Sequence, residues 1–240
     1  MSGDLRELVG RARVIDLSHP LTTDFPLFPV YDPVRVARKF SCEQDGFFVN
    51  SWAFDEHSGT HVDAPAHFGA GAATVERIAP EELILPVAVI DIRERVEHDH
   101  DATVTADDVL AWEGRHGPLP ERCAVFALTG WASRVHDPAE YLNADASGTL
   151  HFPGFSQAVS EFLKDERPGV RAIGVDTASL DIGADTDFPA HVSWLPSGRY
   201  GLENLANLDR LPATGAVAVI GAPALAGGSG GPTRVLALAS

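Results

Sequence analysis

Three short apolar runs constrain the fold of this 240-residue chain more than any other feature. They are Pro86–Ile92, Cys123–Leu128 and Val170–Thr177. None of them alternates strictly between apolar and polar residues, as a strand with one solvent-exposed face would. Such runs are typical of strands that are buried on both faces. The chain is therefore expected to build a sheet with material packed on both of its sides.

The remaining segments predict a mixture of further strands and a few helices. Residues 75–83 are expected to form a short helical turn, and no repeat, low-complexity linker or domain boundary is evident. Because strands outnumber helices and the connections are irregular, the class is α/β or α+β with a mixed β-sheet, in one domain over residues 1–240. Strands are expected at 14–17, 34–41, 47–54, 215–221 and 234–238, and helices at 5–13, 105–114 and 156–166.

Composition limits the partners and the compartment. The net charge of −16 argues against nucleic-acid and anionic membrane partners. No run approaches the ~18 apolar residues of a membrane span, and residues 1–13 lack the apolar centre of a signal peptide. The two cysteines, Cys42 and Cys123, lie far apart and predict neither a disulfide framework nor a thiolate metal cluster. A soluble, cytoplasmic protein is expected.

Chemistry-bearing residues concentrate between His57 and His67. This window holds three of the ten histidines and one aspartate. We expect a turn entering a short strand, in which His61 and Asp63 face the same way, while Gly59 folds His57 back beside them. Imidazole and carboxylate are ligands of Zn, Mn and Fe. The alternative is a set of surface or core histidines, but burying this set without a cation would cost several kcal/mol.

Aromatic residues supply candidates for a substrate wall. Phe25, Phe28 and Tyr31 lie between prolines, either as a loop packed on the core or as an aromatic wall for a ligand. Trp131 follows a predicted buried strand, where a loop can present it to a pocket. Phe25, Phe28 and Trp131 are therefore the candidate substrate-binding residues.

Three other motifs are assigned no direct role in the chemistry. His98 and His100 lie in a charged stretch and predict a solvated loop. The glycine-rich segment 227–231 lacks the Lys and Ser/Thr of a phosphate-binding loop and predicts a structural turn. Asp176 and Thr177, at the end of a predicted strand, either orient ligands or cap that strand.

The run 57–67 resembles the HxGTHxDxPxH signature of the metal-dependent cyclase family, which includes bacterial kynurenine formamidases (arylformamidases) and isatin hydrolases. Residues 16–21, 174–177, 202–205 and 227–234 are similar to other blocks of that family. The resemblance implies a swivelling β/β/α-type fold. It also implies a homodimer or homotetramer whose metal site lies near a subunit interface.

The resemblance also implies roles. His67 matches the residue that accepts and donates the proton, and Phe28 stands where formamidases typically place a Trp against the substrate ring. The cofactor is a divalent metal, Zn or Mn, with one or two ions per chain; isatin hydrolases are regarded as single-Mn enzymes, so the number stays open. The implied ligands are His57, His61 and Asp63 for the first ion and His191 and Glu203, twelve residues apart, for the second.

The function expected from these features is metal-dependent hydrolysis of a small amide, lactam or ester. The first candidate substrate is N-formylkynurenine or a related aryl amide, and the alternative is isatin-like lactam opening. In either case metal-activated water attacks the carbonyl and His67 moves the proton. A ring-closing cyclase, a lyase or dehydratase, and a non-catalytic metal-containing binding protein remain as rival hypotheses.

Overall fold

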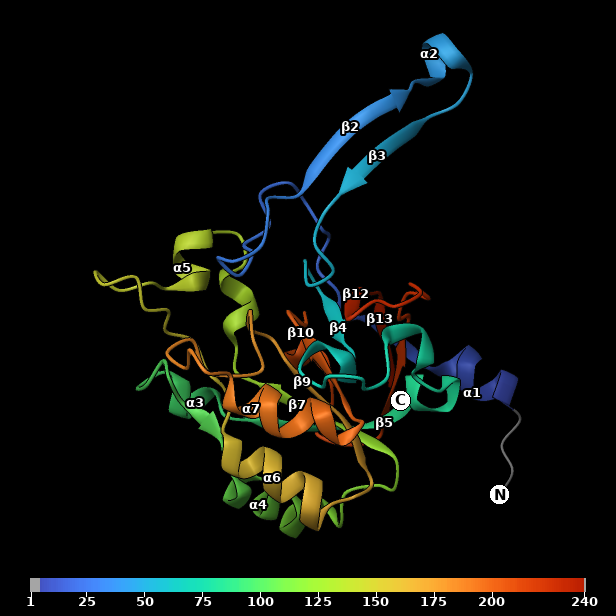
Figure 1. Cartoon of the computed structure of the whole chain (residues 1–240). Coiled ribbons are helices and arrows are strands. Elements are labelled where there is room, and N and C mark those ends of the chain that lie inside the picture. Colours follow the sequence, from blue (N-terminus) through green and yellow to red (C-terminus); the bar gives the residue numbers. More distant parts are fainter. Residues whose placement is uncertain (1–4, 240) are drawn as a thin grey trace.

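The computed structural model describes residues 5–239. Its centre is a nine-stranded mixed sheet in the order β1-β13-β11-β5-β7-β9-β10-β4-β12 (Figure 1). Neighbours from β5 to β10 are parallel, and the pairs on either side of this block are antiparallel. The strands are β1 (Arg13–Asp16), β4 (His61–Asp63), β5 (Ile84–Asp91), β7 (Cys123–Leu128), β9 (Val170–Val175), β10 (Tyr200–Glu203), β11 (Ala216–Ile220), β12 (Gly230–Pro232) and β13 (Val235–Ala239).

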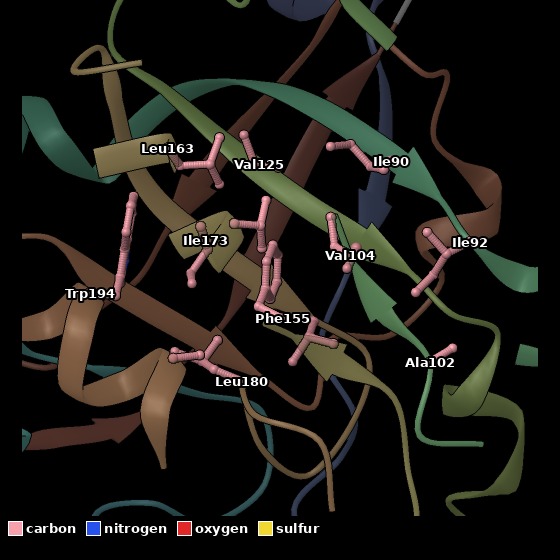
Figure 2. Packing of buried hydrophobic residues seen from close by; sticks show 14 of the residues in the cluster. Ile90, Ile92, Ala102, Val104, Val125, Phe155, Leu163, Ile173, Leu180 and Trp194 are labelled. Atoms are coloured by element: carbon pink, nitrogen blue, oxygen red, sulfur yellow. The ribbon is translucent and has the colours of Figure 1, made fainter. Parts of the chain in front are cut away.

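The three apolar runs are the adjacent central strands β5, β7 and β9. Along β7, alternate side chains belong to two different cores: Val125 lies in one buried cluster and Phe126 in the other. Figure 2 shows the first cluster, where Val125 and Ile173 of the sheet lie with Leu163 and Trp194 from helices. The predicted burial of both faces and the predicted α/β class with a mixed sheet are confirmed.

Helices cover the face of the sheet that carries the first cluster (Figure 1). Polar residues cap the start of two of these helices. Thr105 caps α4 in a capping box with Asp108, and the Ser156 hydroxyl accepts the Val159 N–H at the start of α6. The helices are α1 (Leu5–Arg11), α2 (Cys42–Asp45), α3 (Arg93–Val96), α4 (Ala106–His116), α5 (Pro138–Leu142), α6 (Gln157–Glu166) and α7 (Pro189–Trp194).

The predicted boundaries need small corrections. The helix expected to end at Gly114 continues to His116, and the first predicted helix ends at Arg11. The turn expected at 75–83 consists of two 3-10 segments, η2 (Val75–Arg77) and η3 (Pro80–Leu83). Within residues 5–239, none of the helices combines the length and apolarity that crossing a membrane would require.

A hairpin arm projects from the body (Figure 1). It consists of β2 (Arg35–Phe40) and β3 (Val49–Ala53), with α2 at the tip. Two aromatic residues within the strand predicted at 47–54 are not buried: Phe48 is 52% and Trp52 46% exposed. A separate short pair, β6 (Thr103–Val104) and β8 (Gly154–Phe155), lies outside the main sheet.

Candidate metal centre

The cluster residues are carried by strand β4 and the turn before it. Gly59 has a φ of +66°, which favours glycine. The turn brings His57 back so that its Nδ1 lies 2.6 Å from Oδ1 of Asp63. His61 and Asp63, two residues apart on β4, both face the same carboxylate-rich space, since His61 Nε2 is 3.2 Å from Asp63 Oδ1. The local arrangement predicted from the spacing is therefore present.

Strand pairing brings in the distant carboxylate. β10 lies antiparallel to β4, with Glu203 directly opposite His61. Oε2 of Glu203 is 3.2 Å from His61 Nε2, and its Oε1 is 3.0 Å from Nε2 of His191 on α7. Oε1 also accepts the backbone N–H of Leu180 at 2.8 Å, which fixes the carboxylate. The sheet register thus joins residues that are far apart in the chain.

Asp63 is the shared centre of two potential ligand sets. One set is His57, His61 and Asp63, and the other is Asp63, His191 and Glu203; within each set the ligand atoms lie within 4.8 Å of one another. All five side chains are buried. The structure therefore places every predicted metal ligand in one cluster.

Two buried polar atoms without hydrogen-bond partners in the described part of the chain indicate whether a cation fits between the ligands. His61 Nδ1 lies 2.9 Å from the Gly59 carbonyl, so it carries the hydrogen and donates it. The lone pair of Nε2 then faces Asp63. Nε2 of His61 and Oδ2 of Asp63 are both buried and have no hydrogen-bond partner within the described residues. A divalent cation would satisfy both acceptors at once, so the residues present fit the group.

The electrostatics favour positive charge at this point. Burial lowers the pKa of His61, but the nearby carboxylates of Asp63 and Glu203 raise it to about 10. Burial also lowers the pKa of His191, but its hydrogen bond to Asp181 and the nearby carboxylates of Asp63 and Glu203 raise it well above its ordinary value. In the metal-free protein, protons on these imidazoles therefore take the place of the cation, and a cation that binds there must displace them.

His67 lies beside the ligands without belonging to either ligand set. It ends a 3-10 turn, η1 (Pro65–His67), that follows β4, and its ring stacks on that of His57 with centroids 3.8 Å apart. Burial lowers the pKa of His67, Asp63 raises it, and His57 and His191 lower it further, to about 4. The ring is therefore neutral at pH 7 and can accept a proton.

An aromatic cavity of about 220 Å³ opens onto His67, His191 and Glu203. Phe28, Phe68 and Phe188 line it, with the Phe188 ring 5.8 Å from Phe28 and 5.7 Å from Phe68. Phe28 thus lies where a substrate-binding residue is expected. The cavity places an aromatic-lined space directly against the ligand cluster.

Two predicted substrate-binding residues need correction. Phe25 is 8% exposed and packs near the ring of His19, and it does not line this cavity. Trp131 is 1% exposed within the core, where its indole N–H donates to the Tyr141 carbonyl at 2.7 Å. Burial of these large aromatic side chains, with a partner for the indole, outweighs presenting them to a ligand.

The chain was compared with known proteins. The sequence model of a family described as "Putative cyclase" matches residues 15–182. The chain belongs to this family. It is similar to isatin hydrolase of Roseibium aggregatum, with 35% identity covering 99% of this chain and 93% of that protein. It is also similar to kynurenine formamidase of Bacillus cereus, with 28% identity covering 92% and 95%.

A solved structure agrees with these sequence matches. Isatin hydrolase A from Ralstonia solanacearum superimposes on this cyclase-family protein with a TM-score of 0.93 and 35% identity, covering 100% of this chain and 98% of that one. The likeness therefore extends over the whole chain rather than the signature alone.

Sequence reasoning missed residues that support the ligands of this cyclase-family protein. Asp181 accepts from Nδ1 of His191 at 2.5 Å and from the backbone N–H of Ala190 at 2.5 Å, so His191 presents Nε2 to Asp63. No local pattern marks Asp181, because it lies on an irregular segment. Phe188 was also missed; it precedes Pro189 and has a φ of +50°.

Asp176 and Thr177, expected to orient ligands or to cap their strand, instead bond to groups of the neighbouring loops. Asp176 accepts hydrogen bonds from the Thr129 hydroxyl at 2.5 Å and from the Thr129 and Gly130 N–H groups. The Thr177 hydroxyl donates to the Ser179 carbonyl. Burial raises the pKa of Asp176 to about 6, against the lowering effect of its hydrogen bonds. These contacts tie together the loops after β7 and β9.

Proposed function

We propose that this cyclase-family protein is a metal-dependent hydrolase that adds water across the C–N bond of a small aryl lactam of the isatin type. One observation carries the proposal: the orphaned acceptor pair of His61 and Asp63 lies in the ligand cluster that borders an aromatic cavity. A cation site beside an aromatic-lined cavity is what such a reaction needs.

The preference for a lactam is supported by two comparisons. The likeness to isatin hydrolase is 35% in identity over nearly the whole chain, against 28% for the formamidase. The family resemblance of the sequence also implies that Phe28 stands where formamidases typically carry a Trp. Three Phe side chains around the cavity provide faces and edges for stacking on a fused ring.

A second candidate substrate is an aryl formamide such as N-formylkynurenine. The observation that favours it is the complete second ligand set, in which His191 and Glu203 share Asp63 with the first. Formamidases close a second metal site with a His and a Glu at this spacing. Substrate turnover, rather than ligand geometry, separates these two candidates.

The cation is proposed to be Zn or Mn, with His57, His61 and Asp63 as its ligands and with His191 and Glu203 completing a second position. Such an ion lowers the pKa of bound water towards ~7 and polarises a carbonyl. The protein's own contribution is to keep each imidazole in the orientation that its hydrogen bonds set, and to present the carbonyl carbon from the aromatic cavity.

His67 is proposed to carry the proton. Its neutral ring accepts a proton from the attacking water as the new C–O bond forms. It then donates that proton to the nitrogen as the C–N bond breaks, so that the lactam becomes a carboxylic acid and an amine. No further reactant is needed, because water supplies both the oxygen and the hydrogens.

The assembly is proposed to be a homodimer or homotetramer in the cytoplasm. The arm formed by β2 and β3 exposes Val36, Phe48 and Trp52, and clustered exposed apolar residues are typical of contact surfaces. The same arm carries Arg35, Arg38 and Lys39 on a chain whose net charge is −16. A second, acidic copy of this chain is therefore a suitable partner for the arm. Cys42 and Cys123 are both free, which suits a reducing compartment.

A substrate panel tests the proposal. Protein reconstituted separately with Zn and with Mn is assayed with isatin, N-formylkynurenine and a formanilide. We expect isatin opening to have the highest kcat/KM. A clear preference for N-formylkynurenine would replace the lactam assignment with the formamide one, and absence of hydrolysis of all three would contradict both.

A further inference from the structure

The glycine-rich segment 227–231 reaches the metal centre through one serine. Oγ of Ser229 lies 2.9 Å from Nε2 of His57. The same Oγ lies 2.5 Å from Oε2 of Glu56, and the Ser229 N–H donates to that oxygen at 3.0 Å. Glu56, Ser229 and His57 thus form a continuous chain of contacts leading from the loop to a proposed ligand.

Counting hydrogens sets the direction of these bonds. A serine hydroxyl has one hydrogen to donate, and a carboxylate only accepts. The short contact to an anionic acceptor is the stronger one, so the hydroxyl donates to Glu56. Ser229 Oγ must then accept from His57, which requires a hydrogen on Nε2. With the Nε2 hydrogen given to Ser229, Nδ1 is the nitrogen that is left to bind a cation or, without one, a proton shared with Asp63 Oδ1 at 2.6 Å.

His57 therefore presents a different nitrogen from the other two histidines. His61 and His191 both donate Nδ1–H, to the Gly59 carbonyl and to Asp181, and both direct Nε2 towards Asp63. His57 directs Nδ1. The Ser229 hydroxyl selects the Nε2–H tautomer of His57 because it donates its only hydrogen to Glu56 and can therefore only accept from the ring.

We propose that Ser229 and Glu56 are positioning residues for the first cation: they hold His57 as the Nε2–H tautomer and leave Nδ1 to bind the ion. The inference rests on the metal site of the proposed function and adds the residues that tune it. Metal-binding histidines generally donate their other N–H to a fixed acceptor, and loss of that acceptor costs about 10–100-fold in metal affinity.

The sheet holds this serine in place. β12 pairs with β4 so that Gly230 lies opposite Asp63, and the Ser229 carbonyl accepts the N–H of Ala64 at 2.9 Å. A Cβ at Gly230 would stand 2.4 Å from the Val62 carbonyl oxygen and 2.7 Å from Cε1 of His57. Only glycine permits this close approach, which brings the hydroxyl of Ser229 within hydrogen-bond distance of the ring.

The test measures metal affinity rather than turnover. Metal-free wild type, Ser229→Ala, Ser229→Thr and Glu56→Gln are titrated with Zn against a competing chelating dye. We expect Ser229→Ala to bind about 10–100-fold more weakly. Ser229→Thr, which keeps the hydroxyl, should stay near wild type. Glu56→Gln, which keeps an acceptor oxygen but loses the charge, should lie between them. Ser193→Ala is the matched control, because its hydroxyl donates to the Ala190 carbonyl near His191 and touches no ligand.

A spectroscopic readout separates this proposal from the proposed function. Long-range ¹H–¹⁵N spectra of histidine-labelled, Zn-loaded protein should show His57 protonated at Nε2, with Nδ1 as the metal-bound nitrogen. Metal affinity of Ser229→Ala within threefold of wild type, or a His57 protonated at Nδ1, would overturn the proposal. If wild type binds no metal, the proposed function fails and the positioning role fails with it; if wild type binds metal and Ser229→Ala binds it equally well, only the positioning role fails.

Discussion

The imidazole ring of His67 stacks on the ring of His57, with centroids 3.8 Å apart and an interplanar angle of 24°. The candidate proton carrier, His67, is thus in direct ring contact with a proposed metal ligand, His57. Burial is the main cause of the lowered pKa of His67, and the neighbouring His57 and His191 lower it further although Asp63 raises it. Burial beside the ligand cluster therefore keeps His67 neutral, while the carboxylates among the ligands attract positive charge.

Replacing His67 tests its separation from the ligands. In His67→Ala we expect kcat/KM to fall about 10²–10⁴-fold, because proton transfer in both halves of the reaction is lost. Bound metal per chain, measured by elemental analysis on the same samples, should be unchanged. His98→Ala, in an exposed loop, is the control. A parallel fall of metal content and activity would make His67 a ligand instead.

Replacing His191 tests the second ion. Since Asp63 belongs to both ligand sets, the wild type should bind two ions per chain at saturating metal and His191→Ala only one. Elemental analysis after gel filtration gives the ratio directly. One ion per chain in both proteins would refute the binuclear arrangement and leave a single ion among His57, His61 and Asp63.

The raised pKa of His61 predicts opposite pH trends for metal binding and for the metal-free fold. In metal-free protein the imidazole holds a proton up to about pH 10, and this proton must leave when a cation binds. Metal affinity should therefore rise with pH, by about tenfold per pH unit for each displaced proton.

The same shift makes the protonated ring stabilise the metal-free protein. This contribution is complete below the unfolded-state pKa of about 6.5 and is lost as pH rises towards the folded-state value. The Tm of chelator-treated protein should consequently fall between about pH 6.5 and pH 10, while that of metal-loaded protein should fall less. A Tm of the metal-free protein that rises over this interval would contradict the assignment.

Phe188 allows strain and ring contacts to be measured separately. Its φ of +50° and ψ of +53° are left-handed values that a bulky side chain rarely adopts. Phe188→Gly and Phe188→Ala both remove the ring from the cavity, but only glycine also removes the strain. We expect both to lose a similar part of kcat/KM for an aryl substrate, through KM. Urea unfolding should show the glycine variant more stable than the alanine variant by about 1 kcal/mol. Equal stabilities would mean that no strain is stored there.

Particular residues show how far the sequence can predict this protein. The central strands were predictable because their apolar runs leave no solvent-exposed face. The convergence of His61 and Asp63 was predictable because residues two apart on a strand lie on one face. Glu203 was implied as a metal ligand by the family resemblance, through its distance of twelve residues from His191. The pairing of β10 with β4 explains why it lies beside His61.

Other residues carry no such local signal. Ser229 lies in a small-residue turn and Asp181 in an irregular segment, and each acquires its role only through a distant strand or helix. Phe25 and Trp131 do not line the cavity, because the sequence shows that Phe25 precedes a proline and that Trp131 follows a strand, but not whether either side chain turns inward. Their burial is decided by three-dimensional packing.

Metal add-back to the stripped enzyme tests the central claim most directly. Protein treated with a chelator and dialysed is titrated with Mn or Zn, and isatin hydrolysis is measured together with bound metal per chain. The proposed function predicts background activity in the stripped protein and activity that rises in proportion to bound metal until the site is full. Full hydrolytic activity in protein without bound metal would contradict it.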